Sequence, residues 1–185
     1  MIKDILKDAD SRMNKAVEVV RSEFSRIRTG KATTSLLDGI KVDYYGNPIP
    51  LNQVGSISTP DIHTIAIQVW DKGAIQSVEK AIQNANLGLN PIADGQLLRI
   101  PIPKLNEERR KELVKLIKKF AEEGKVAVRN VRRDAIEHLK RAEKDEHVSE
   151  DERKHAETEI QKYTDKHIKD IDILFQQKEK EIMEV

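Results

Sequence analysis

Apolar residues recur every three or four positions in three long stretches of the chain, a spacing that predicts three amphipathic helices. The predicted helices span residues 2–29, 106–145 and 149–183. In the second of them the apolar repeat is close to 3.5 residues, as in a coiled-coil seam. No such helix is stable alone, so the three apolar faces must cover one another, and the pattern predicts a long three-helix bundle.

The expected helix ends carry recognisable signals. Asn106 is a suitable N-cap, and "SEDE" at 149–152 places Ser149 and Glu152 at the spacing of a capping box. Gly30 is expected to end the first helix in the left-handed conformation that glycine tolerates. Gly124 interrupts the second helix, where it indicates either close packing or a bend.

The middle of the chain, residues 31–103, has a different character because it contains all 6 prolines. Strand-like runs occur in "IKVDYYG", "TIAIQVW" and "LLRIPIP", the tripeptide "GNP" at 46–48 predicts a turn, and residues 72–88 predict a short helix. The predicted class is therefore α+β. A discontinuous bundle of residues 1–30 and 104–185 carries an inserted β/α/β domain of residues 31–103.

The chain crosses between the two predicted domains twice. One crossing lies at Gly30 and Lys31, and the other lies at Pro103 and Lys104. Two connections side by side suit a double hinge, and a rigid insertion is the alternative that the pattern leaves open.

The sequence "GK" at 30–31 suggests a phosphate-binding loop, but the surrounding residues do not fit one. Such a loop needs a glycine five residues before its second glycine, a serine or threonine after its lysine, and a preceding strand. Here Ser25 and Ala32 occupy those two positions, and a predicted helix precedes them. We interpret the stretch as a helix end.

Composition removes several other classes of function. The chain has no cysteine, so thiol nucleophiles, disulfides and thiolate metal sites are excluded. No apolar run is long enough to span a membrane, and the first residues do not resemble a targeting peptide, which fits a cytoplasmic protein. The five histidines form no metal-binding pair, and His167 is expected to be packed against the bundle core. No catalytic motif and no cofactor site are found.

Charge is distributed unevenly along the chain. Residues 104–145 carry 14 basic and 9 acidic side chains, whereas residues 146–185 carry 7 and 12. Helical geometry places six basic residues of the second helix away from the core position Val131. They are Lys118, Lys125, Arg129, Arg132, Arg133 and Lys140.

This basic face has two interpretations that charge alone does not separate. Arginines can hold phosphates through two parallel hydrogen bonds, so RNA or another polyanion is one candidate ligand. The other interpretation is an ordinary solvated helix face, on which Asp134 and Glu137 pair with some of the cations. Because aromatic residues are only 4% of the chain, an RNA ligand would be recognised through its backbone and shape.

Several motifs together resemble those of the bacterial ribosome recycling factor family, from one end of the chain to the other. They are "RTGKATTSLLDGIKVDYYGNPIPLNQV", "VEKAIQNANLGLNPIADG", "LLRIPIPKLNEERRKEL", "VRNVRRDA", "SEDE" and "QKYTDKHIKDID". The resemblance implies an L-shaped, cytoplasmic monomer without catalytic activity, made of a three-helix bundle and a hinged β/α/β domain.

The resemblance also implies partners and site residues. Members bind the 70S ribosome after termination, and the bundle contacts 23S rRNA of the large subunit. Elongation factor G and GTP then drive the hinged domain, so that the subunits separate and mRNA and tRNA leave. Carried over, the rRNA contacts are Arg129, Arg132 and Arg133, with Lys125 beside them and Arg28 as a further candidate. The inserted domain is implied to face the elongation factor.

Two other classes of function stay open on the residues alone. A coiled-coil scaffold would bind protein through its bundle and would need no RNA. An RNA-modifying enzyme would need a nucleophile or cofactor site, which the sequence does not offer.

Overall fold

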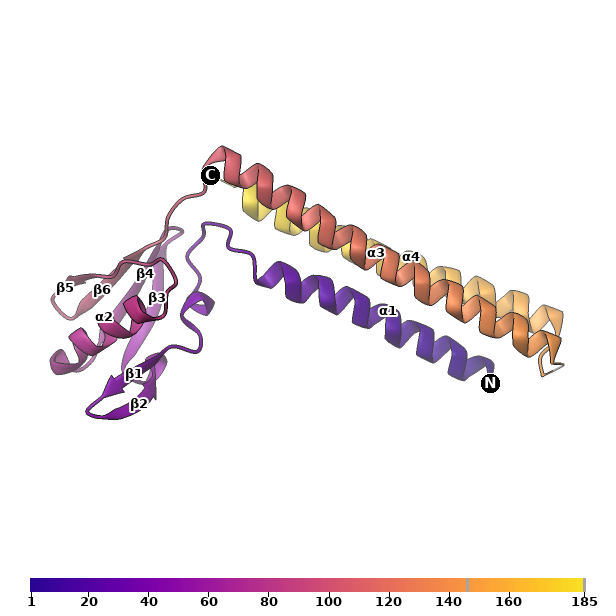
Figure 1. The fold of residues 1–185 in the computed structure, drawn as a ribbon, viewed down its shortest axis with the longest axis horizontal. Coiled ribbons are helices and arrows are strands. Elements are labelled where there is room, and N and C mark those ends of the chain that lie inside the picture. The colour runs from indigo at the N-terminus through magenta and orange to yellow at the C-terminus, as the bar shows by residue number, and fades with distance from the viewer. Residues whose placement is uncertain (146, 185) are drawn as a thin grey trace. The chain divides into compact units, whose positions relative to one another are not determined.

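The computed structural model describes residues 1–145 and 147–184, and it divides into two compact units (Figure 1). The first unit comprises Met1–Arg28 together with Asn106–Val185, and the second comprises Thr29–Leu105. The second unit therefore begins and ends two residues outside the predicted 31–103. A helical bundle in the first unit and a mixed second unit confirm the predicted α+β class.

Three helices pack side by side in the first unit: α1 (Ile2–Ser25), α3 (Glu107–Lys144) and α4 (Glu150–Met183). Each buries one apolar stripe against the other two, as the periodicity predicts. The buried residues are Ala9, Met13, Val17, Val20 and Phe24 of α1; Leu113, Ile117, Ala121, Gly124, Val128, Val131, Ala135, Leu139 and Ala142 of α3; and Ala156, Ile160, Thr164, His167, Ile171 and Ile182 of α4.

The predicted N-terminal caps of α3 and α4 are confirmed. The side-chain oxygen of Asn106 accepts a hydrogen bond from the backbone N–H of Arg109 at 2.7 Å. The Ser149 hydroxyl accepts from the Glu152 N–H at 3.2 Å, and the Glu152 carboxylate accepts from the Ser149 N–H at 2.7 Å. These bonds satisfy amide groups that the first helical turn leaves without partners.

The predicted end of the first helix is wrong by several residues. The helix ends at Ser25, because the N–H groups of Arg26 and Ile27 bond the carbonyls three residues back, at 3.3 and 3.2 Å. This tighter last turn closes the helix without a glycine. Gly30 has the expected positive φ of 76°, but it lies in the following segment rather than at the helix end.

Gly124 marks a close approach between α3 and α1. A Cβ atom added there would overlap Cγ2 of Val20 and lie 3.2 Å from Cδ1 of Ile171. The sequence left close packing and a bend as alternatives, and the structure shows close packing within the continuous helix α3.

The second unit contains two antiparallel sheets, one α-helix and three short 3₁₀ helices. Strands β1 (Lys41–Tyr44) and β2 (Asn47–Pro50) form a hairpin. Strands β3 (Gly55–Asp61), β4 (Thr64–Val69), β6 (Leu97–Pro101) and β5 (Ile92–Asp94) form a sheet in the order β3-β4-β6-β5. Helix α2 (Ile75–Asn84) connects β4 to β5.

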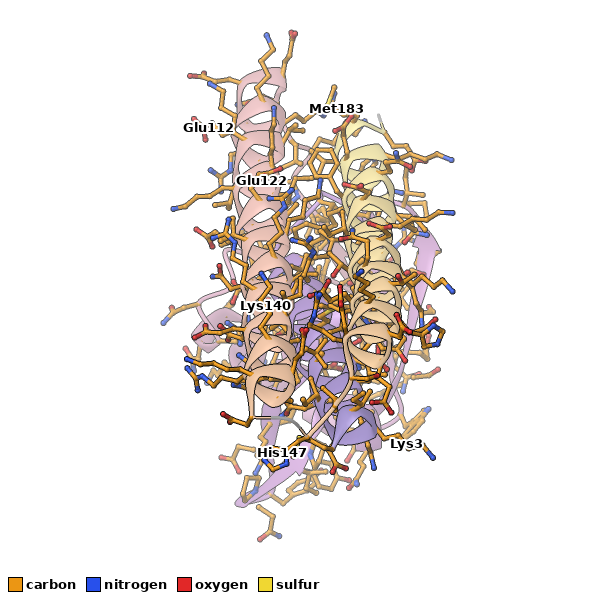
Figure 2. The ribbon with its side chains drawn as sticks, turned by 90° about the vertical axis from the view of Figure 1, so that its right-hand side faces the viewer. Lys3, Glu112, Glu122, Lys140, His147 and Met183 are labelled. Carbon is orange, nitrogen blue, oxygen red and sulfur yellow. The ribbon has the colours of Figure 1, made fainter. Side chains whose placement is uncertain are left out.

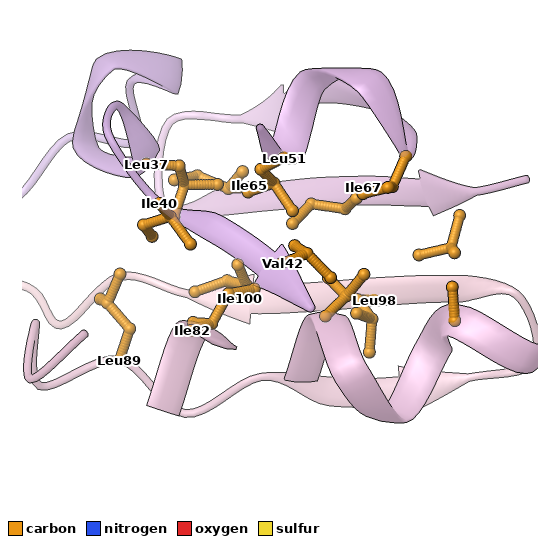
Figure 3. Packing of buried hydrophobic residues seen from close by; sticks show 14 of the residues in the cluster. Leu37, Ile40, Val42, Leu51, Ile65, Ile67, Ile82, Leu89, Leu98 and Ile100 are labelled. Atoms are coloured by element: carbon orange, nitrogen blue, oxygen red, sulfur yellow. The ribbon is translucent and has the colours of Figure 1, made fainter. Parts of the chain in front are cut away.

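One apolar core lies between the four-stranded sheet, α2 and the hairpin (Figure 3). Alternate residues of β4 and β6 point into it, including Ile65, Ile67 and Leu98. Val42 of the hairpin and Ile82 of α2 fill the opposite side. The sheet thus buries one face, as antiparallel sheets commonly do.

Sequence patterns located β1, β4 and β6 but missed β2, β3 and β5. Prolines conceal β2 and β3, since Pro48, Pro50 and Pro60 occur within these strands. Strands at the edge of a sheet tolerate proline because part of their backbone needs no ladder partner. The predicted turn at 46–48 is shifted, because Tyr45 and Gly46 make the tight turn at φ values of 51° and 88°.

No helix among residues 1–145 and 147–184 has the length and apolar character required to cross a membrane.

Replacing Gly124 with alanine is expected to destabilise the bundle. The new methyl group would overlap Val20, and overpacking of this kind costs about 1–3 kcal/mol. That cost opposes the roughly 1 kcal/mol by which alanine favours a helix interior over glycine. Thermal and urea unfolding should therefore show a lower stability for Gly124→Ala. Asn130→Ala, on the exposed side of α3, serves as the control and should be neutral or slightly stabilising. Equal stability of Gly124→Ala and wild type would contradict the close approach.

Candidate RNA-binding face

The outer side of α3 carries a group of cations without acidic partners. Arg129, Arg133, Lys118 and Lys140 are exposed, and within the described residues none of them forms an ion pair. Figure 2 shows charged side chains covering the outer surfaces of α3 and α4, with Lys140 labelled on α3. We call Arg129, Arg132 and Arg133 the arginine face.

Two members of the predicted face lie nearer to α4 than expected. The Lys125 side chain is only 18% exposed, and its Nζ lies 2.5 Å from the Asp172 carboxylate of α4 and 3.8 Å from Glu122. Arg132 is half-buried, and its Nε donates a hydrogen bond to Oε1 of Gln161 at 2.8 Å. The expectation that Lys125 points outward is therefore wrong.

The error arises from the choice of Val131 as the centre of the buried stripe. Ala121 and Leu139 are also buried, and at 100° per residue they lie about 80° from Val131. Arg132 and Lys125, at about 100° and 120°, are next to that border of the stripe. They occupy the flank of α3 that faces α4, whereas Arg129 and Arg133 project to solvent.

The carboxylates that could neutralise the arginine face have other partners. Asp134 lies 3.0 Å from the guanidinium of Arg12 on α1, and Glu137 lies 2.9 Å from Arg141. The interpretation of the face as an ordinary solvated surface offered these two residues as partners for some of its cations. Their engagement elsewhere leaves positive charge concentrated on this side of the bundle.

Arg28 lies outside the helix in which it was predicted. It is exposed and follows the end of α1 at Ser25 by three residues, so it belongs to the segment that leaves the bundle.

The residues predicted at the crossings all fall within the second unit, and the turn between β3 and β4 holds both connecting segments. The N–H of Ala32 donates to the Ile62 carbonyl at 2.7 Å, and the His63 ring nitrogen Nδ1 lies 3.0 Å from the Gly30 carbonyl. The N–H of Ile102 donates to the His63 carbonyl at 2.7 Å. His63 was missed by sequence reasoning, because its partners are distant along the chain.

The same turn is stabilised from within. The Asp61 carboxylate accepts the backbone N–H of His63 at 2.8 Å, and this bond is the main reason why the pKa of Asp61 lies below its ordinary value. Gly30 also packs closely, since an added Cβ would lie 3.2 Å from Cγ of Leu105. Gly30 is thus fixed to the second unit, and Lys31, Pro103 and Lys104 lie within that unit as well.

An aromatic cluster stands at the hairpin of the second unit. Tyr44 and Tyr45 meet edge to face with ring centroids 4.6 Å apart, and their hydroxyls donate to the Asp71 carboxylate at 2.9 and 3.1 Å. Tyr45 is 74% exposed, and Trp70, which precedes Asp71 in the chain, is 61% exposed. Sequence reasoning treated these residues only as strand formers. Two consecutive tyrosines beside a predicted turn were the sequence signal that could have indicated this exposed cluster.

Hydrogen bonds to Asp71 shift the pKa values of the cluster. The pKa of Asp71 is lowered, first by the backbone N–H of Gly73 at 2.9 Å and then by the two tyrosine hydroxyls. The pKa values of Tyr44 and Tyr45 are raised, chiefly because each hydroxyl donates to that carboxylate.

Histidine and carboxylate groups form no cluster of three or more that could hold a metal ion in the part of the chain that the structure describes. His167 is buried in the bundle, with its Nε2 atom 2.7 Å from the Asp10 carboxylate of α1. The expectation of a packed histidine is confirmed.

Comparison with known proteins identifies close relatives. The ribosome recycling factor family model matches residues 20–183. The ribosome-recycling factor of Oleidesulfovibrio alaskensis is 55% identical over 181 residues, covering 98% of each chain. That of Symbiobacterium thermophilum is 53% identical over 185 residues, covering 100% of each chain.

Two solved structures are also similar to the chain. A solution structure of ribosome recycling factor is 48% identical with a TM-score of 0.76, and the match covers 100% of this chain and 98% of the other. A second neighbour, with 46% identity and a TM-score of 0.63 over 100% of both chains, is the T. thermophilus ribosome recycling factor. It belongs to a set of models for that factor and for E. coli elongation factor G bound to the E. coli post-termination complex.

Asp71→Asn is expected to destabilise the protein at neutral pH and to matter less in acid. Since folding lowers the pKa of Asp71, its carboxylate stabilises the fold above the ordinary value near 3.9. That contribution is lost as the pH falls through the lower folded-state value. Thermal unfolding at several pH values should show a Tm difference at pH 7 that shrinks below about pH 4. Asp38→Asn is a control in the same unit, and a difference independent of pH would contradict the assignment.

Proposed function

The chain belongs to the ribosome recycling factor family, and we propose that it binds the post-termination ribosome through the arginine face of its bundle. The ligand is the large subunit of the 70S ribosome, at 23S rRNA. With elongation factor G and GTP, the bound protein promotes separation of the subunits and release of mRNA and tRNA. The similar factor that is bound to a post-termination complex together with elongation factor G supports this assignment of partners.

The observation that carries the RNA contact is the arginine face itself. Arg129 and Arg133 are exposed and unneutralised within the described residues, while the nearby Asp134 and Glu137 bind other cations. Free guanidinium groups can donate paired hydrogen bonds to phosphate oxygens and displace condensed counterions. A rigid helix holds them at fixed spacing, which suits recognition of folded RNA by its backbone and shape. Arg28 and Lys125 are secondary candidates, Lys125 the weaker because Asp172 pairs with it.

The chain acts without chemistry of its own in this proposal. It binds no cofactor, and GTP hydrolysis belongs to the elongation factor. It works as a cytoplasmic monomer that contributes a binding surface and a second unit on which the partner acts. The scaffold and RNA-modifying alternatives gain no support, since neither explains a family match over residues 20–183.

In this proposal the joint between the units lies outside the residues that the β3–β4 turn holds. Gly30, Ala32 and Ile102 are bonded to that turn, so they move with the second unit. Hinge motion is then expected where the chain leaves that unit, at Arg28–Thr29 on one side and Leu105–Asn106 on the other. The predicted hinge residues Gly30, Lys31, Pro103 and Lys104 therefore border the proposed joint from within the second unit.

Arg129→Ala and Arg133→Ala are each expected to weaken binding to vacant bacterial 70S ribosomes by about tenfold, as expected for one charge-assisted hydrogen bond of roughly 1.5 kcal/mol. Each should also reduce the slope of log K against log salt by about one, because one phosphate contact is lost. Affinity is measured by fluorescence anisotropy over a series of KCl concentrations. Lys162→Ala, on α4 with its cation paired to Glu159, is the matched control. Affinities and slopes like those of the control would refute the RNA contact.

Locking the two units together is expected to preserve ribosome binding and block recycling. The natural chain has no cysteine, so no other thiol competes when an introduced pair is oxidised. Each pair has one cysteine in the first unit and one in the second. Pairs that oxidise fully are compared in a polysome-breakdown assay with purified elongation factor G and GTP. The reduced form of the same variant is the control and should regain activity. Full activity of the oxidised form would show that no hinge motion is needed.

A further inference from the structure

Arg132 differs from other arginines of the bundle in the charge of its partner. Arg12 pairs with Asp134, Arg141 with Glu137, and Arg153 with Glu157, at 3.0, 2.9 and 2.8 Å; all three partners are carboxylates. The partner of Arg132 is the side-chain amide of Gln161 on α4, whose oxygen accepts the Nε–H at 2.8 Å. An amide oxygen orients a guanidinium without cancelling its charge.

A second hydrogen bond fixes the direction of that amide. Nε2 of Gln161 donates to Oδ1 of Asp165, one turn further along α4, at 2.8 Å. A carboxylate can only accept, and a guanidinium can only donate. The amide between them must therefore present its NH₂ group to Asp165 and its oxygen to Arg132, so the two bonds support one orientation.

We propose that Gln161 is a positioning residue that holds Arg132 ready for an RNA phosphate while leaving its positive charge intact, and that Asp165 sets the orientation of the amide. This inference rests on the proposed ribosome-binding function and deepens it. The binding surface then includes both α3 and α4, with a residue of the more acidic helix supporting a cation of the more basic one.

The geometry of the guanidinium suits this role. The bond to Gln161 uses Nε, and no described residue is bonded to Nη1 or Nη2. The Nη1–Nη2 edge presents two parallel N–H donors, which match two phosphate oxygens. Holding the side chain in advance removes part of the entropy cost of ordering it on binding.

Lys125 supplies a natural contrast on the same flank of α3. Its Nζ lies 2.5 Å from the Asp172 carboxylate of α4, so the charge is already matched within the protein. Lys125 is therefore the weaker candidate for binding the ligand, whereas Arg132, on the same flank of α3, keeps its charge available to a polyanion.

The test separates orientation from charge by two replacements of Gln161. Gln161→Met removes the acceptor but keeps the net charge, so binding to vacant 70S ribosomes should weaken about threefold to tenfold with an unchanged salt slope. Gln161→Glu keeps an acceptor but neutralises Arg132, so the salt slope should fall by about one. Gln176→Met and Gln176→Glu are matched controls, since Gln176 is exposed on α4 and its side chain has no hydrogen bond among the described residues.

Two further measurements distinguish positioning from a general structural effect. In an Arg132→Ala background, Gln161→Met should cause no additional loss, because the two residues act as one unit. The Nε–Hε signal of Arg132 in a ¹H–¹⁵N spectrum should shift and exchange faster with water in Gln161→Met, while the thermal unfolding of the protein stays unchanged. Lys125→Ala should alter the salt slope less than Arg132→Ala.

The possible failures are separable. Wild-type affinity and slope in Arg132→Ala would overturn the RNA contact of Arg132, and the inference with it. Weak binding by Arg132→Ala, together with Gln161 variants that behave like their Gln176 counterparts, would overturn the positioning role and leave the proposed function standing. Additive losses in the double variant would also overturn the positioning role.

Discussion

Close packing of three helices, each with one narrow apolar stripe, is the constraint on which the rest of the structure depends. Each helix buries only one stripe, and at one close approach of α3 to α1 Gly124 leaves Val20 the space that a larger side chain would fill. Because the bundle has no thicker core, most of each helix remains in contact with water. Long charged side chains cover those exposed surfaces (Figure 2), and the pairing of these charges then decides what the surface can bind.

Ion pairs between helices arrange that surface charge unequally. Asp134 of α3 lies against Arg12 of α1, and Asp172 of α4 lies against Lys125 of α3. These pairs contribute little stability individually, because they are partly exposed and screened. Their larger effect is on surface charge: Asp134, the chain neighbour of Arg133, is matched to Arg12, so a contact that connects two helices also leaves the outer side of α3 more positive.

The second unit follows a different principle, because its stability comes from a core enclosed by a sheet, a hairpin and one helix (Figure 3). Its β3–β4 turn is hydrogen-bonded to the two segments through which the chain enters and leaves the unit. His63 and Ile62 bond residues that are some 30 to 40 positions away on either side. The unit is therefore one connected body up to its borders.

The sequence by itself determined the three helices, two of their caps, the existence of an inserted mixed unit and the identity of the arginine cluster. Those features depend on local periodicity, capping groups and composition, which can be recognised from residues that are close together in the sequence. Only the tertiary structure decided where the first helix ends, which edge strands proline-rich segments form, and that Lys125 is paired while Arg132 rests on Gln161. The reason is physical: each of these depends on atoms brought together from distant parts of the chain, and the periodicity of one helix gives the angle of a side chain without saying which neighbour it meets.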